Sequence, residues 1–175
     1  MQNLTTNIIN KNNIKIISFN LGNEEFAIDI KYIQEIIKSP NITPIPLTKN
    51  YILGVINVRG EIIPVIDAKL KMNIKLDYIS QKKEENISDT DSSNLYSKKL
   101  EYTTNLTRII ILSHENRKVG IKVDSMNKVI TASSEQISQP TLISEDASYR
   151  FTESIYAIDD KLVAIININA LLDTK

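Results

Sequence analysis

The chain has 175 residues, of which 42% are hydrophobic and 24% charged, a composition typical of an ordinary globular protein. Its 21 basic and 21 acidic side chains give a formal net charge of 0, so it lacks the basic excess expected of a nucleic-acid-binding protein. It has no cysteine, which excludes disulfides, cysteine-ligated zinc and thiol catalysis.

Residues 1–13 are polar and lack a basic start followed by an apolar segment, so they predict an N-terminal tail rather than a signal peptide. In the rest of the chain, no apolar run approaches the roughly 18 residues that a membrane-spanning helix needs. We therefore expect a cytoplasmic protein with no direct membrane insertion.

Alternating apolar and polar residues predict that most of the chain forms short β-strands with one buried face. In chain order, the strands are expected at Ile14 to Leu21, Phe26 to Ile30, Leu53 to Val58, Ile62 to Asp67, Thr107 to Ser113, Val119 to Val123, Lys128 to Ala132, Ser154 to Ile158 and Leu162 to Asn167. Turn residues separate them at Gly22-Asn23, Arg59-Gly60, Glu115-Asn116 and Asp159-Asp160. Short helices are expected only at Ala68 to Met72 and Ile168 to Leu172. This pattern predicts an all-β fold, either barrels or a sandwich.

An isoleucine-rich segment follows the second predicted strand and is interrupted by prolines, which confine strands to sheet edges. We expect most of its apolar side chains to lie in the core, with one or two exposed as anchors for a partner. The isoleucines concerned are Ile33, Ile36, Ile37, Ile42 and Ile45, and the prolines are Pro40, Pro44 and Pro46.

The two halves of the chain resemble each other. In each, a polar turn leads into an apolar strand and then a short leucine-containing helix, as comparison of Val58 to Ile66 with Ile158 to Ile166 shows. We interpret the halves as two related small β-barrels sharing a core. Residues 75–105, between them, are rich in Lys, Glu, Asp, Ser and Asn, and predict a long polar loop inserted into the domain.

The stretch from Leu53 to Asp67 predicts a β-hairpin with Arg59 at its tip, an unusual place for a permanent planar charge unless it meets a carboxylate. Glu35, which has apolar neighbours on each side, is the partner that we expect. In the alternative interpretation the two are separate solvated charges. Were the pair partly buried, breaking it would cost roughly 3 to 5 kcal/mol.

Patterns that would indicate catalysis or metal binding are weak. Asp89 and Asp91 begin something like a calcium loop, but Asn94 and Leu100 stand where that loop needs Gly and a bidentate Glu. His114, the single histidine, is expected in a surface turn, without a nucleophile-elbow sequence to accompany it. Paired carboxylates in a sugar-binding cleft would need stacking aromatics, and the chain has no tryptophan. We predict no catalytic residues, no metal and no cofactor.

Several sequence blocks, in their order and spacing, resemble the CheW-like chemotaxis coupling proteins. The most specific is Asn57-Val58-Arg59-Gly60, followed by Ile63-Pro64-Val65-Ile66-Asp67. Further matching blocks run from Phe19 to Ile30, from Ile42 to Pro46, from Val119 to Met126 and from Leu162 to Leu172.

This resemblance implies a single CheW-like domain over residues 14–172, built of two packed SH3-like five-stranded β-barrels with a few short helices. The function it implies is that of a non-catalytic adaptor without a cofactor. The polar insertion at 75–105 departs from the family pattern and puts the geometry of any ring assembly in question.

The partners implied by the resemblance are the regulatory domain of a histidine autokinase and the cytoplasmic tip of a chemoreceptor, at the inner face of membrane receptor arrays. Ring assembly with itself or with the kinase is also implied. The positions that match the family's kinase-facing region are Ile33, Glu35, Ile42, Thr43 and Gly54. Those that match its receptor-facing region are Arg59 and Leu171.

Other interpretations remain open. The chain could be a CheW-like adaptor of a non-flagellar sensory system or of a variant chemosensory array. A small β-barrel enzyme would need a nucleophile and a base that the sequence does not supply. A small nucleic-acid-binding barrel would need a basic face with stacking aromatics, and 3 Phe and 7 Tyr are few for that role.

Overall fold

The computed structural model describes residues 13–74, 106–140, 150–158 and 161–173. The polar insertion predicted at 75–105, the Asp159-Asp160 turn and all but the last residue of the predicted tail lie outside the described residues. No described helix is long and apolar enough to cross a membrane.

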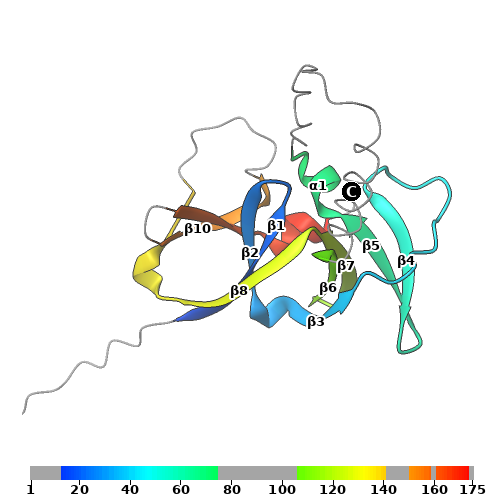
Figure 1. The fold of residues 1–175 in the computed structure, drawn as a ribbon, viewed down its shortest axis with the longest axis horizontal. Coiled ribbons are helices and arrows are strands. Elements are labelled where there is room, and N and C mark those ends of the chain that lie inside the picture. The colour runs from blue at the N-terminus through cyan, green and yellow to red at the C-terminus, as the bar shows by residue number, and fades with distance from the viewer. Residues whose placement is uncertain (1–12, 75–105, 141–149, 159–160, 174–175) are drawn as a thin grey trace, which may run out of the picture.

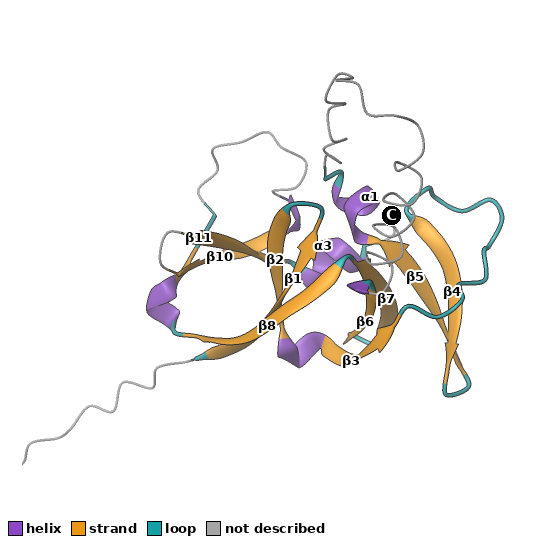
Figure 2. Cartoon of the chain, viewed as in Figure 1, coloured by secondary structure: helices purple, strands orange, loops and turns teal. Residues whose placement is uncertain are grey.

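Most of the described chain is β-strand (Figure 2). The strands are β1 (Ile14–Leu21), β2 (Glu24–Asp29), β3 (Ile33–Lys38), β4 (Ile52–Val58), β5 (Glu61–Asp67), β6 (Arg108–His114), β7 (Arg117–Val123), β8 (Ser125–Ala132), β9 (Ile137–Ser138), β10 (Thr152–Ile158) and β11 (Lys161–Ile166). The helical elements are α1 (Ala68–Met72), α3 (Ile168–Leu172) and the single 3-10 turns η1 (Ile30–Tyr32) and η2 (Ser134–Gln136).

The described strands form two sheets that curl into two small barrels lying side by side (Figure 1). Barrel A has the strand order β8-β1-β2-β11-β10-β9, and barrel B has the order β3-β6-β7-β5-β4. The sixth strand of barrel A is the two-residue β9. The predicted all-β fold of two packed small barrels is confirmed.

The barrels do not coincide with the two halves of the chain. The β1–β2 hairpin from the first half joins barrel A through a parallel pairing of β2 with β11, and the β6–β7 hairpin from the second half joins barrel B through a parallel pairing of β7 with β5. After each hairpin the chain crosses to the other barrel. The internal repeat is therefore real, but each barrel combines a hairpin of one half with the remaining strands of the other.

The largest hydrophobic cluster lies between the barrels. Phe19 and Phe26 contribute from barrel A, and Leu112 and Ile121 from barrel B. Each barrel also has its own interior cluster. The helices α1 and α3 have five residues each, too few to be stable alone, and they are held by burying their apolar sides in the cluster between the barrels.

Two tight turns predicted from the sequence are present. Arg59 and Gly60 have φ values of 53° and 88°, and Glu115 and Asn116 have 48° and 62°. Positive φ at both central residues is the geometry of the two-residue hairpin turn that matches strand twist.

Strand β3 was not predicted from the alternation of residues, and the residue types at its positions explain why. Its register against β6 shifts between Ile33 and Glu35, which marks a β-bulge. Exposure still alternates residue by residue along β3, but a partly buried Glu35 and an exposed Ile36 reverse the apolar and polar order on which the strand prediction depends.

Candidate functional site

The β4–β5 hairpin holds Arg59 at a fixed place on barrel B. Asn57 and Ile62 face each other in the last pairs before the turn, and the Asn57 side-chain oxygen accepts a hydrogen bond from the Gly60 N–H at 2.9 Å. Arg59 itself adopts a left-handed backbone conformation, which costs a non-glycine residue about 1 kcal/mol. The turn is thus closed from within, and the arginine side chain is left to reach outward.

The structure brings Arg59 and Glu35 together. Arg59 Nη2 donates to Glu35 Oε2 at 3.1 Å, which joins the hairpin tip to β3. The Arg59 side chain is 82% exposed, whereas that of Glu35 is 19% exposed. Because the guanidinium end of this pair is exposed to solvent, the pair contributes about 0 to 1 kcal/mol to stability.

The second carboxylate oxygen of Glu35 is left without a hydrogen-bond partner. It is the one fully buried side-chain oxygen or nitrogen without a partner in the described part of the chain. Because a carboxylate can accept several hydrogen bonds, Glu35 keeps unused acceptor capacity beside its contact with Arg59.

Three more of the predicted site residues meet where barrel B closes. Thr43 and Val55 exchange two backbone hydrogen bonds of 2.9 Å each, forming an isolated bridge beside β4. Gly54, with φ of 141°, permits this approach, because a Cβ there would lie 2.1 Å from the Thr43 carbonyl oxygen and 3.0 Å from Ile42 Cγ2. These contacts give Gly54 a structural reason to be glycine and leave the Thr43 side chain exposed.

Barrel B also carries large apolar side chains that are exposed. Ile36 on β3, Ile45 and Leu47 in the segment before β4, and Ile62 on β5 are all exposed. The isoleucine-rich segment therefore supplies two exposed isoleucines, while Ile37 and Ile42 pack against the interior of barrel B. This division agrees with the expectation of one or two exposed anchors.

Two predicted interface residues lie elsewhere. Leu171 on α3 is 0% exposed and belongs to the cluster between the barrels, so its side chain cannot touch a partner. Its assignment to a receptor-facing surface is corrected to a role in the core. Ile33 also packs against that cluster and is only partly accessible.

A polar network between the barrels was not predicted from the sequence. Asp124, where the chain crosses from β7 to β8, accepts from Lys69 Nζ at 2.7 and 3.0 Å and from the Gly22 N–H at 2.7 Å. Lys69 belongs to α1 and Gly22 to the β1–β2 turn, so one carboxylate joins elements of both barrels. The sequence shows Asp124 only as a carboxylate at the end of a strand.

The described residues include no group of three or more His, Cys, Asp and Glu side chains close enough to hold a metal ion. The stretch at Asp89 and Asp91 lies outside the described residues. His114, at the end of β6, packs edge-on against the Tyr32 ring with centroids 5.0 Å apart.

Comparison with known proteins places this geometry in a family. The model of the CheW-like domain matches residues 15–175. The chemotaxis protein CheW of Bacillus subtilis is 32% identical over 92% of this chain and 88% of its own length. The probable chemotaxis protein CheW of Rhizobium etli is 28% identical over 93% and 90%. The crystal structure of the scaffolding protein TtCheW from Thermoanaerobacter tengcongensis superposes with a TM-score of 0.71 at 31% identity, covering 93% of this chain and 89% of that one.

Proposed function

The chain belongs to the CheW-like family, and from that premise we propose that it is a non-catalytic chemotaxis adaptor that couples chemoreceptor tips to a histidine autokinase. The observation that carries the proposal is the outer surface of barrel B, which has an arginine fixed at a hairpin tip and several exposed apolar side chains. We place the adaptor in the cytoplasm, at the inner face of membrane receptor arrays.

The kinase-facing surface is proposed at the closure of barrel B, around Thr43, Gly54 and Glu35. The backbone bridge and Gly54 fix this region, so a partner meets a surface that is already ordered. The neighbouring exposed Ile45 and Leu47 offer apolar area that gains by being covered.

The receptor-facing contact is proposed at Arg59. Its guanidinium is exposed and oriented by a single bond to Glu35, so most of its donors are available to a carboxylate on a receptor tip. The charge stands at the tip of a two-residue hairpin that is itself anchored by Asn57.

Assembly into rings is supported by the internal repeat. Ile62 is the second residue of β5 in barrel B, and Leu162 is the second residue of β11 in barrel A; both are exposed. The two barrels thus present apolar residues at corresponding positions on opposite halves of the molecule. A head-to-tail contact between unlike faces produces rings when the rotation closes.

The coupling itself is proposed to work through rigid contact. Barrels have few free edges and deform little, and the Asp124 network ties the two barrels together. A displaced receptor tip would then move the kinase with the adaptor. The proposal fails if the protein binds both partners and kinase activity stays insensitive to receptor state.

Binding of the two partners tests the assignment of Arg59. Titration calorimetry with a receptor tip fragment is expected to show at least about tenfold weaker binding by Arg59→Ala, or about 1.4 kcal/mol. The matched control is Arg117→Ala, which removes another exposed hairpin arginine with a 3.1 Å ion pair to a glutamate, Glu115. Equal affinities of the two variants would remove Arg59 from the receptor contact.

A second pair of variants tests the kinase-facing surface. Thr43→Arg keeps the backbone bridge but places a bulky charge on the closure of barrel B, and we expect it to abolish binding of the kinase regulatory domain. Thr131→Arg, at an exposed threonine of β8 in barrel A, is the control. If folded wild-type protein binds neither partner, the adaptor function is wrong for this chain.

A variant array or a non-flagellar sensory system is the second candidate. The exposed surface of barrel B supports this second candidate as well as the first, because the same side chains would bind the partners. Measuring which receptor tips and which kinase domains of the same cell bind to the wild-type protein separates the two.

A further inference from the structure

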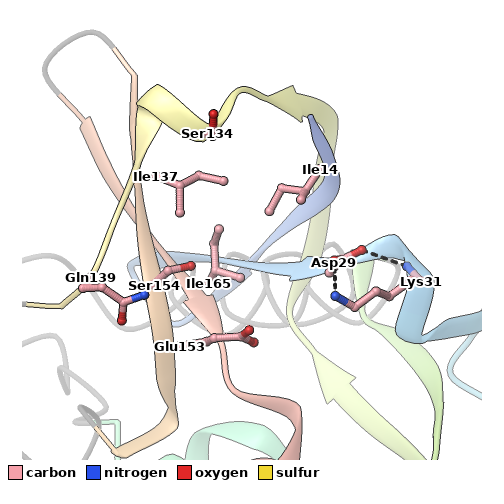
Figure 3. Close-up of a pocket in the computed structure, with 9 residues that line it drawn as sticks. All are labelled: Ile14, Asp29, Lys31, Ser134, Ile137, Gln139, Glu153, Ser154 and Ile165. Carbon is pink, nitrogen blue, oxygen red and sulfur yellow. Dashed lines mark hydrogen bonds and ion pairs between the residues drawn. The ribbon is translucent and has the colours of Figure 1, made fainter. Parts of the chain in front are cut away.

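Barrel A has a cavity at one end of its interior (Figure 3). Its volume is about 290 Å³, and its apolar wall is made by Ile14, Ile137 and Ile165. Ile165 belongs to the interior cluster of barrel A, and the other two pack against that cluster. The cavity is therefore the open end of the barrel interior, close in size to the smaller ligand pockets of proteins.

In barrel B, the segment after β3 packs onto the barrel interior and bridges to β4. Ile42 of this segment and Leu53 of β4 pack against isoleucine and valine side chains, and Thr43 forms the bridge to Val55. In barrel A the corresponding end is bordered by η2 and the two-residue β9 instead. The interior of barrel A also contains the small side chains of Ala27 and Ala132.

The polar wall of the cavity carries an ion pair that neutralises itself. Asp29, whose side chain is 13% exposed, accepts from the Lys31 N–H at 3.0 Å and from Lys31 Nζ at 2.8 Å. The hydrogen bond to Asp29 raises the pKa of the Lys31 ammonium, against the opposing effect of partial burial. Lys31 is thus held as a cation by Asp29, and together they leave no net charge.

One further carboxylate lines the cavity, that of the exposed Glu153 on β10. Ser154, a residue that is 8% exposed, and Gln139 lie on the same side of the cavity as Glu153, whereas Ser134 lies across it, beyond Ile137 (Figure 3). With the Asp29–Lys31 pair neutral, the cavity has a net negative charge, uncharged hydrogen-bonding groups and an apolar wall.

We propose that this cavity binds a small organic cation, a primary ammonium with a short branched aliphatic body. The ammonium lies by the Glu153 carboxylate and the Ser154 hydroxyl, and the aliphatic body covers the three isoleucines. An anion of the same shape is repelled by Glu153, and a neutral analogue loses the ion pair.

This site is independent of the adaptor function proposed above, since it lies in barrel A and uses none of the proposed interface residues. It does touch η1 through Lys31, and η1 leads directly into β3, which carries Glu35. A bound ligand therefore contacts the segment where the chain crosses from barrel A to barrel B.

The test is a titration of the full chain, with isotope-labelled isoleucine methyl groups, followed by NMR. The probe is isopentylamine, and isopentanol and isocaproate are its neutral and anionic analogues. We expect saturable shifts of the Ile14, Ile137 and Ile165 methyl signals with the amine, while Ile109 and Ile111 inside barrel B serve as unshifted references.

Two variants assign the charge. Glu153→Gln is expected to bind the amine about fivefold more weakly, the size of one exposed ion pair. Glu24→Gln, at an exposed glutamate where β2 begins, far along the strand from Asp29, is expected to bind like wild type. The absence of saturable shifts, equal binding of the amine and its analogues, or wild-type affinity of Glu153→Gln would each overturn the proposal.

Discussion

The two barrels share a strand plan but fill it differently. β8-β1-β2-β11-β10 in barrel A corresponds to β3-β6-β7-β5-β4 in barrel B. At one matched pair of positions, barrel A has Ser18 opposite Ala27 and barrel B has Ile111 opposite Gly120. In barrel B, a large side chain therefore lies opposite a glycine, which has no side chain. In barrel A, two small side chains lie opposite each other.

The two barrels also differ in the polarity of their interiors and in how one end is closed. Barrel B has an interior of aliphatic side chains and an end closed by the Thr43–Val55 bridge. Barrel A retains a polar interior residue, Ser18, which is 0% exposed, and an open end. The same topology therefore gives one barrel an end closed by a backbone bridge and the other an end with a cavity.

The largest difference in stability between the two barrels is expected from Gly54→Ala. The new Cβ would collide with the Thr43 backbone, and alanine is strained at φ of 141°, so we expect a loss of more than about 3 kcal/mol of unfolding free energy. Gly22→Ala in barrel A, with φ of 63° and open space around it, should cost about 1 kcal/mol. Urea unfolding of both variants measures the difference, and similar losses would refute the close-approach argument.

A smaller effect is expected at the matched interior positions. A Cβ on Gly120 would lie 2.8 Å from Ile109 Cγ2 and 3.3 Å from Val65 Cγ2, so Gly120→Ala overpacks barrel B at a cost of about 1 to 3 kcal/mol. Its mirror change, Ala27→Gly, should cost about 1 kcal/mol in barrel A through lost packing and added chain freedom. Thermal unfolding of the two variants compares them. A stabilised Gly120→Ala would show that barrel B is not tightly filled.

The smallest effect on stability is expected at Glu25, on β2 of barrel A. Partial burial raises the pKa of Glu25, but hydrogen bonds from Ser18 and Asn127, with Lys128 and Lys161 nearby, outweigh it and lower that pKa below 4.5. A lowered folded-state pKa contributes stability that is present above pH 4.5 and is lost as the pH falls through the folded value.

Glu25→Gln should therefore be slightly less stable than wild type at neutral pH, with the gap narrowing in acid. Urea unfolding of both proteins at neutral pH and at about pH 3 measures this gap. A gap that widens in acid would contradict the direction of the pKa shift. Asn127→Ala provides the matched variant, since it removes one of the hydrogen-bond donors to Glu25.

Much of the fold could be predicted from the sequence because local patterns carry it. The alternation of residues locates most strands to within a few positions, and α1 and α3 have the predicted bounds. The Arg59-Gly60 and Glu115-Asn116 turns follow from their residue types. β3 was missed because Glu35 occupies a partly buried position and Ile36 an exposed one.

The exchange of hairpins between the barrels could not be predicted, because β2 pairs with β11 across more than half of the chain and no local pattern encodes that choice. The same limit applies to the site. The contact between Glu35 and Arg59 was anticipated from their types and surroundings, but the burial of Leu171 and the Asp124 network depend on which helices pack between the barrels. How the site residues serve binding stays a prediction.

The hairpin exchange also determines when the chain can complete its structure during synthesis. The ribosome releases β1 and β2 first, but β11, which pairs with β2, ends only at Ile166. The first strands therefore cannot complete their sheet until nearly the whole chain has been made. Barrel B can assemble once β7 has emerged at Val123, and barrel A, which contains the N-terminal strand, is completed second. Contacts so distant in sequence slow folding, and a chain severed between α1 and β6 would yield two fragments, neither holding a whole barrel.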